Sequence, residues 1–136
     1  MWRILIVDDN FSNRKLLLDI LEDHARCDVA ANGREAIDAF NQSVPDTPYQ
    51  LILLDIAMPE VNGLEVLKMI RDAEKKSGIE LGDGIPVIMV TAYKQPFIEA
   101  FDRGCDDYIL KPIDPDELVQ KIKDKIGEPG EAIPPA

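Results

Sequence analysis

The chain has 136 residues, of which 46% are hydrophobic and 30% are charged, a balance typical of one globular domain and unlike that of a disordered chain. It carries 15 Lys and Arg against 26 Asp and Glu, and the resulting net charge of −11 argues against binding to nucleic acids or to an anionic membrane surface. The two cysteines, Cys27 and Cys105, lack the spacing of a disulfide framework or a metal site, and no segment resembles a signal peptide or a membrane span, so we expect a soluble protein of the reducing cytoplasm.

The first half of the chain alternates predicted strands and helices. Apolar runs that stop at charged residues predict buried strands, and apolar residues at helical spacing predict helices. Strands are expected at residues 2–7, 28–31 and 50–54, and helices at residues 11–25 and 34–42. Asn10 is the expected N-cap of the first helix, and two prolines make residues 44–48 a loop.

The second half continues the same alternation. A helix is expected at residues 64–75, followed by an exposed, glycine-containing loop at residues 76–84. Two more strands are expected at residues 86–90 and 108–110, with further helices at residues 96–103 and 115–126. Residues 127–136 are rich in proline and glycine, which predicts a tail or the start of a linker after a domain of residues 1–126.

This order of elements predicts an α/β fold. Five mainly apolar strands that alternate with helices indicate a parallel sheet covered on both faces. We expect a flavodoxin-like, doubly wound, five-stranded sheet of order 2-1-3-4-5 with five helices. The carboxyl ends of all strands then share one edge, where strands one and three flank the point at which ligands bind.

Polar side chains follow four of these strands and should meet at that edge. Asp8 and Asp9 follow the first strand, and Asp55 the third. Thr91 closes the fourth strand and Lys111 the fifth. Three carboxylates and one ammonium leave an excess of negative charge that a cation must offset, and carboxylate oxygens suit Mg²⁺. A carboxylate beside a metal, an ammonium and a hydroxyl predicts phosphoryl transfer to an aspartate.

Four motifs in this order resemble those of a known family. They are VDDN at residues 7–10, DIAMPEVNG at 55–63, VTA at 90–92 and DDYILKP at 106–112. Over residues 2–126 the chain resembles the receiver domains of two-component response regulators, of the chemotaxis type.

The resemblance implies a role for each residue of the site. Asp55 would be the phosphoacceptor. Asp9 would bind Mg²⁺ directly and Asp8 partly through water, together with Asp55 and the backbone carbonyl of Ala57. Thr91 and Lys111 would contact the phosphoryl oxygens. Thr91 and Tyr108 would form the switch, with the tyrosine changing rotamer on phosphorylation. The bond between Lys111 and Pro112 would be cis.

The resemblance also implies partners. The phosphoryl donor would be a histidine of a sensor histidine kinase or a histidine phosphotransfer protein, acting in trans, because the one histidine, His24, lies in a surface context. The first helix, with Phe11 and Arg14 beside the acids, is the expected docking face for that donor. An output partner or a second copy would bind the face formed within residues 97–126, which includes Phe97. Ala57 and Tyr93 flank the path of hydrolytic water, where neither can orient it, so we expect a long-lived phosphorylated state.

Other interpretations remain open. Asp8 and Asp9 could simply cap a helix, Asp55 could be a turn residue, and Thr91 and Lys111 could be an ordinary strand residue and a surface lysine. The alternative function is a Mg²⁺-dependent phosphatase of the haloacid-dehalogenase type, which needs a second acid two residues after its nucleophile, where this chain has Ala57. A flavodoxin-like flavin carrier is a third possibility, although residues 8–11 would repel a flavin phosphate. We expect a switch that catalyses only its own phosphorylation and dephosphorylation, and not a turnover enzyme.

Overall fold

A five-stranded parallel sheet organises the molecule. The computed structural model describes residues 1–56, 58, 62–80, 82–92 and 104–130. The strands are β1 (Trp2–Val7), β2 (Ala25–Ala30), β3 (Leu51–Leu54), β4 (Val87–Thr91) and β5 (Asp107–Leu110). Their order is β2-β1-β3-β4-β5, and every neighbouring pair is parallel. The predicted flavodoxin-like topology is therefore confirmed.

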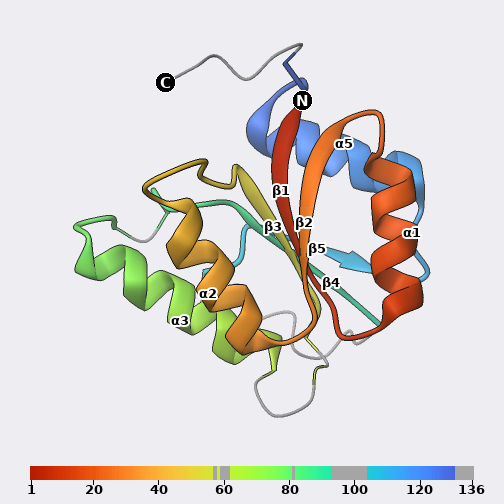
Figure 1. The fold of residues 1–136 in the computed structure, drawn as a ribbon. Coiled ribbons are helices and arrows are strands. Elements are labelled where there is room, and N and C mark those ends of the chain that lie inside the picture. Colours follow the sequence, from red (N-terminus) through yellow and green to blue (C-terminus); the bar gives the residue numbers. More distant parts are fainter. Residues whose placement is uncertain (57, 59–61, 81, 93–103, 131–136) are drawn as a thin grey trace.

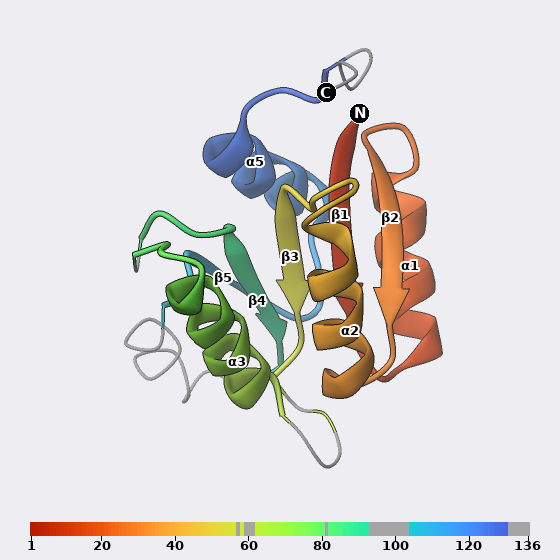
Figure 2. The ribbon, with the colours of Figure 1, turned by 60° about the vertical axis from the view of Figure 1, so that its left-hand side comes forward.

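Four helices of the described residues cover the two faces of this sheet. They are α1 (Phe11–Leu21), α2 (Gly33–Ser43), α3 (Gly63–Lys76) and α5 (Pro115–Ile126). Figures 1 and 2 show α1 and α5 on one face and α2 and α3 on the other. The fifth expected helix, at residues 96–103, lies outside the described residues.

Each of these helices begins at a polar cap that the sequence supplies. The side chains of Asn10, Asn32, Asn62 and Asp114 accept hydrogen bonds from amides in the first turns of α1, α2, α3 and α5. Such a cap satisfies a backbone donor that has no partner within the helix. The expected N-cap at Asn10 is confirmed, with its Oδ1 3.0 Å from the amide nitrogen of Asn13. The caps fix the helix starts beside the carboxyl ends of the preceding strands.

The sheet divides the hydrophobic core into two clusters. Side chains from one face of the strands pack against α2 and α3, and those from the other face pack against α1 and α5. β3 and β4 are buried along their whole length because both of their faces are covered. Burying both faces explains why these strands are continuous apolar runs.

The boundary between α1 and β2 corrects two expectations. The predicted helix at residues 11–25 ends at Leu21, and the strand predicted at residues 28–31 begins at Ala25. The backbone of Ala25 pairs with that of Trp2 in β1, and its side chain is buried in the core. Pairing with β1 therefore outweighs the helical propensity of this segment.

The N-terminus and the segment after α5 meet at the opposite edge of the sheet from the strand carboxyl ends (Figure 1). The indole nitrogen of Trp2 donates to the carbonyl oxygen of Gly127 at 2.9 Å, and the Met1 amine contacts the carbonyl of Gly130. The Trp2 ring also stacks on His24, with the ring centroids 5.9 Å apart. The first residues of the predicted tail are thus held against β1.

The described residues contain neither a disulfide bond nor a membrane-spanning helix. Cys27 and Cys105 are both free thiols. Within the described ranges, no helix combines the length and the apolar character needed to cross a membrane.

Candidate functional site

Three carboxylates meet at the carboxyl edge of the sheet. Asp8 and Asp9 follow β1, and Asp55 follows β3, its neighbour in the sheet. One carboxylate oxygen from each of the three lies within 4.8 Å of the others. Asp8 and Asp55 are buried, whereas Asp9 is exposed. The predicted convergence of the three acids is therefore observed.

Lys111 brings a positive charge into this cluster from the end of β5. Its Nζ lies 3.1 Å from Oδ2 of Asp8 and 3.4 Å from Oδ2 of Asp55. The peptide bond between Lys111 and Pro112 is cis, as the resemblance implied. Lys111 contacts both buried acids and offsets one of their two negative charges.

Thr91 and Tyr108 lie on the two neighbouring strands β4 and β5. Thr91, the last residue of β4, is fully buried, and the backbone nitrogen of Lys111 donates to its carbonyl oxygen at 2.9 Å. Tyr108 is also buried, and burial is the first cause of its raised pKa. Thr91 is therefore at the carboxyl edge, whereas Tyr108 is the second residue of β5 and pairs in register with Met89 of β4. Their roles in switching stay predictions.

The turn between β1 and α1 is held by hydrogen bonds to Asp8. The amide nitrogen of Asn10 donates to Asp8 Oδ1 at 2.9 Å, and the amide of Asp8 donates to the carbonyl of Ala30 at 3.1 Å. Arg14, in α1, donates from Nη1 to the carbonyl oxygen of Asp8 at 2.9 Å, and its guanidinium lies 5.9 Å from the centre of the Phe11 ring. Sequence reasoning placed Arg14 beside the acids but did not predict this bond.

The connection from β3 to α3 brings Gly63 against the backbone of Asp55. The amide nitrogen of Gly63 donates to the carbonyl oxygen of Ile56 at 2.8 Å. A Cβ at position 63 would overlap the carbonyl oxygen of Asp55 and would lie 2.7 Å from the Cα of Ile56. Only glycine allows this close approach of two backbone segments. Two further predicted site residues, Ala57 and Tyr93, lie outside the described residues.

The donor set fits a hard divalent cation. The three acids and Lys111 sum to −2, so a divalent cation would bring the site to neutrality. Carboxylate oxygens suit Mg²⁺, which keeps several waters, and the exposed Asp9 leaves the site open to solvent. The cluster can therefore accept a cation and, beside it, an anionic group such as a phosphoryl group.

Comparison with known proteins decides the family. The sequence model of the response regulator receiver domain matches residues 4–123. The chain belongs to the response regulator receiver family. It is 38% identical over 128 residues to the polar-differentiation response regulator DivK of Brucella anthropi, with 92% of this chain and 96% of DivK covered.

The receiver domain also matches part of a much longer protein. It is 37% identical over 131 residues to the hybrid signal transduction histidine kinase L of Dictyostelium discoideum, covering 94% of this chain but only 7% of the kinase. The matching region thus makes up nearly all of DivK but only a small part of the kinase.

Two solved structures share the fold closely. TrrA of Thermotoga maritima, solved in complex with Mg²⁺ and BeF, is 36% identical with a TM-score of 0.76, covering 91% of this chain and 98% of TrrA. The receiver domain of Ssk1 from Saccharomyces cerevisiae, solved with the histidine phosphotransfer protein Ypd1, is 30% identical with a TM-score of 0.80. That match covers 92% of this chain and 88% of the other.

A part-buried ion network that sequence reasoning missed joins α3 to the segment before β5. Arg71 donates to the carbonyl oxygens of Gly104 and Ile85, and pairs with Glu74 at 2.7 Å and Asp106 at 3.1 Å. Glu74 in turn accepts from the amide of Ile85 at 2.7 Å. A charged residue in a helix carries no sequence signal that it will be buried, and only the packing of α3 on these loops reveals it.

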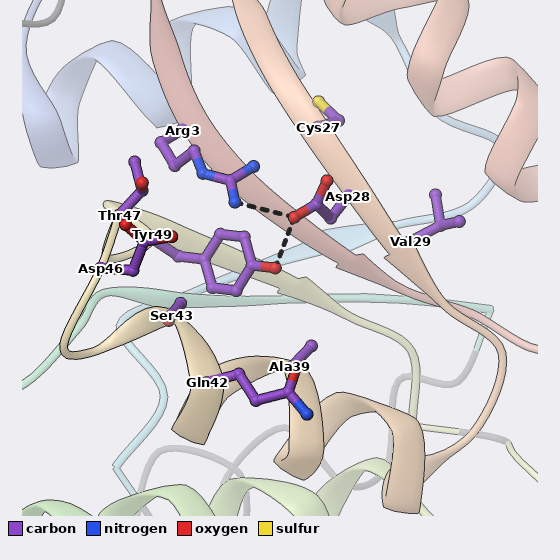
Figure 3. A pocket seen from close by; sticks show the side chains of 10 residues that line it. All are labelled: Arg3, Cys27, Asp28, Val29, Ala39, Gln42, Ser43, Asp46, Thr47 and Tyr49. Atoms are coloured by element: carbon purple, nitrogen blue, oxygen red, sulfur yellow. Dashed lines mark hydrogen bonds and ion pairs between the residues drawn. The ribbon is translucent and has the colours of Figure 1, made fainter.

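A separate pocket lies on the α2 face of the sheet, by the edge strand β2 (Figure 3). It has a volume of about 630 Å³. Asp28 accepts from Tyr49 at 2.6 Å and pairs with Arg3 at 2.9 Å, and Arg3 lies over the Tyr49 ring at 4.7 Å. Burial would raise the pKa of Asp28, but the bonds from Tyr49 and Arg3 outweigh it and lower that pKa. These polar groups satisfy one another.

The alkylation rates of the two cysteine thiols test the burial that the structure shows for them. Burial, and then the charge of Asp28, raises the pKa of Cys27 to about 12, and burial with nearby Asp106 and Asp107 raises that of Cys105 to about 12. Only the thiolate reacts, so a raised pKa slows alkylation. We expect iodoacetamide at pH 8 to alkylate both cysteines more than about tenfold more slowly than in the urea-unfolded chain. Mass spectrometry of the two peptides measures this, and equal rates in both states would contradict it.

Proposed function

We propose that this receiver domain is a signalling switch that accepts a phosphoryl group from a phosphohistidine onto Asp55, with Mg²⁺ as cofactor. The observation that carries the proposal is the convergence of Asp8, Asp9 and Asp55 within 4.8 Å, with Lys111 between the two buried acids. The Mg²⁺ and BeF bound in TrrA support the cofactor, since TrrA is a family member of similar fold.

Each residue would have a defined part in the transfer. Asp8, Asp9, Asp55 and the backbone carbonyl of Ala57 would hold Mg²⁺, which when bound neutralises charge on the phosphoryl oxygens. An oxygen of Asp55 attacks phosphorus, the new P–O bond forms, and the P–N bond to the donor imidazole breaks. The imidazole leaves with the bonding electron pair and takes up a proton. Lys111 and Thr91 would contact the transferred oxygens.

The donor would be a sensor histidine kinase or a histidine phosphotransfer protein acting in trans. The Ypd1–Ssk1 complex supports this partner, because Ypd1 is a histidine phosphotransfer protein bound to a receiver domain. His24 is the only histidine in the sequence and stacks on Trp2, beside the first residues of β1 and β2 and away from the acids at the other end of β1. The exposed Phe11, with Arg14 beside it, would form part of the docking face on α1. We place this exchange in the cytoplasm.

The output face would lie within residues 97–126, on β5 and α5. Lys121 of α5 donates to Oδ1 of Asp107 and to the carbonyl of Tyr108, both at 3.0 Å, and these two bonds join α5 to β5. Leu110 is an exposed apolar residue at the end of β5. We propose that an output partner or a second copy binds here. Phe97 belongs to the same predicted face but lies outside the described residues.

Phosphorylation with a small donor tests the function. With Mg²⁺ and acetyl phosphate, intact-mass spectrometry should show one added phosphoryl group per chain, and EDTA should prevent it. A phosphatase of the haloacid-dehalogenase type would instead release phosphate continuously from p-nitrophenyl phosphate. Turnover of that substrate without accumulation of phosphorylated protein would overturn the proposal.

The lifetime of the phosphorylated state gives a further prediction. We propose that Ala57 and Tyr93 leave the hydrolytic water poorly oriented, because alanine has no polar group and the tyrosine hydroxyl is distant. The double variant Ala57→Asn and Tyr93→Glu should therefore dephosphorylate about tenfold faster, which corresponds to about 1.4 kcal/mol in the barrier. Decay of the phosphorylated mass after acetyl phosphate is removed measures it. Equal decay in both proteins would show that these side chains do not set the lifetime.

A further inference from the structure

We infer that Arg14 is a positioning residue for the Mg²⁺ site: its hydrogen bond to the carbonyl of Asp8 sets the position of Asp9. The inference rests on the proposed function, because it concerns the same Mg²⁺ site. It assigns to Arg14 a second task besides its place on the donor-docking face.

Asp8 is held firmly without Arg14. Its backbone amide donates to Ala30 in β2, its Oδ1 accepts from the amide of Asn10, and its Oδ2 pairs with Lys111. Its side chain is buried. These three contacts fix the carboxylate of Asp8, so removing Arg14 leaves that ligand in place.

Asp9 is in a different situation. It is exposed, and among the described residues no hydrogen bond or ion pair of its side chain is found. Its position therefore depends on the backbone of the turn, and above all on the peptide plane that joins it to Asp8. The guanidinium of Arg14 donates to the carbonyl oxygen of that plane at 2.9 Å, in a part-buried position. Fixing that oxygen fixes the direction in which the chain enters Asp9.

Arg14 is itself anchored on α1. Its backbone amide donates to the carbonyl of Asn10 at 3.0 Å, and its guanidinium lies over the Phe11 ring. Because Asn10 also caps α1, the helix start, the turn and the guanidinium form one connected unit. Partners that orient metal ligands in this way typically change metal affinity by about 10- to 100-fold when removed.

The two possible roles of the Arg14 guanidinium, as a positive charge or as a positioning group for Asp9, predict opposite changes in Mg²⁺ affinity when Arg14 is replaced. If the guanidinium acted only as a positive charge beside three acids, its removal would strengthen Mg²⁺ binding. If it positions Asp9, its removal should weaken that binding. We expect Arg14→Met to raise the Mg²⁺ dissociation constant at least about tenfold, measured by calorimetric titration with MgCl₂ on the unphosphorylated protein.

Two further variants separate these causes. Lys15, exposed on the next position of α1, forms no side-chain hydrogen bond or ion pair with another described residue, so Lys15→Met removes the same charge and should change the dissociation constant less than about twofold. Arg14→Lys keeps a cationic donor and should recover most of the affinity. Thermal unfolding in EDTA shows that each variant is folded. In saturating Mg²⁺, Arg14→Met should regain most of its phosphorylation rate with acetyl phosphate.

Three results would overturn the inference. They are unchanged or tighter Mg²⁺ binding by Arg14→Met, an equal loss in Lys15→Met, and no recovery in Arg14→Lys. Failure of the proposed function would look different, because the wild-type protein would then bind no Mg²⁺ at millimolar concentration and would accept no phosphoryl group.

Discussion

Replacing Asp55 with asparagine should abolish phosphorylation by acetyl phosphate, with at least a hundredfold loss of labelling. The carboxylate oxygen is the nucleophile, and a neutral amide cannot take its place. The variant should still fold, because asparagine has the same shape and Lys111 keeps Asp8 as a partner at 3.1 Å. Removing one of three clustered acids also relieves repulsion, so we expect the thermal midpoint to stay within about 5 °C of the wild type.

The matched control for this variant is Asp38→Asn. Asp38 is a carboxylate of α2 that does not belong to the acid cluster, and its loss should leave labelling unchanged. Peptide mapping after borohydride reduction identifies the labelled residue in the wild type. If the Asp55→Asn protein is labelled to the same extent as the wild type, with no label on a neighbouring acid, Asp55 is excluded as the acceptor.

Replacing Gly63 with alanine should destabilise the fold and slow phosphorylation together. The new methyl group would overlap the carbonyl of Asp55 and press on the Cα of Ile56, and both contacts are with backbone that cannot rotate away. Overpacking of this kind costs about 1–3 kcal/mol or more. We expect the upper end, a fall of about 10 °C in the thermal midpoint. Because the displaced segment carries Asp55, the phosphorylation rate should fall at least about tenfold.

Gly78→Ala is the control variant for Gly63→Ala. Gly78 has a φ of +84°, and a Cβ there would meet nothing within 4 Å, so its replacement imposes backbone strain without a clash. We expect it to cost about 1 kcal/mol and to leave phosphorylation unchanged. Equal stability of Gly63→Ala and the wild type would show that the turn between β3 and α3 can move away from Asp55 at little cost.

The candidate site could be predicted from the sequence because its residues stand at strand ends. Each acid follows an uninterrupted apolar run, and in a parallel sheet those runs must finish at the same edge. The convergence of Asp8, Asp9 and Asp55 with Lys111 follows from topology alone. Apolar residues at helical spacing likewise predicted the helices α3 and α5, and Leu67, Ile70, Leu118 and Ile122 of these helices are buried.

What the sequence could not provide depends on contacts between distant segments. The expected first helix extended to residue 25, yet the chain joins the sheet from Ala25 onward because β1 offers backbone partners. The bond from Arg14 to the Asp8 carbonyl depends on one side-chain rotamer. The partial burial of Arg71 depends on the segments that contain Ile85 and Gly104, whose carbonyl oxygens it contacts. None of these contacts produces a periodic pattern of residues in the sequence.

The place of Trp2 decides how this protein can be followed optically. It is the only tryptophan, and it lies at the start of β1, about 20 Å of strand away from Asp8 at the other end. Its indole is engaged with Gly127 and His24. Intrinsic fluorescence will therefore respond to release of the tail from β1 and remain nearly silent when the acid cluster is filled. A fluorophore introduced at the exposed Phe11, as Phe11→Trp, would report on the cluster instead.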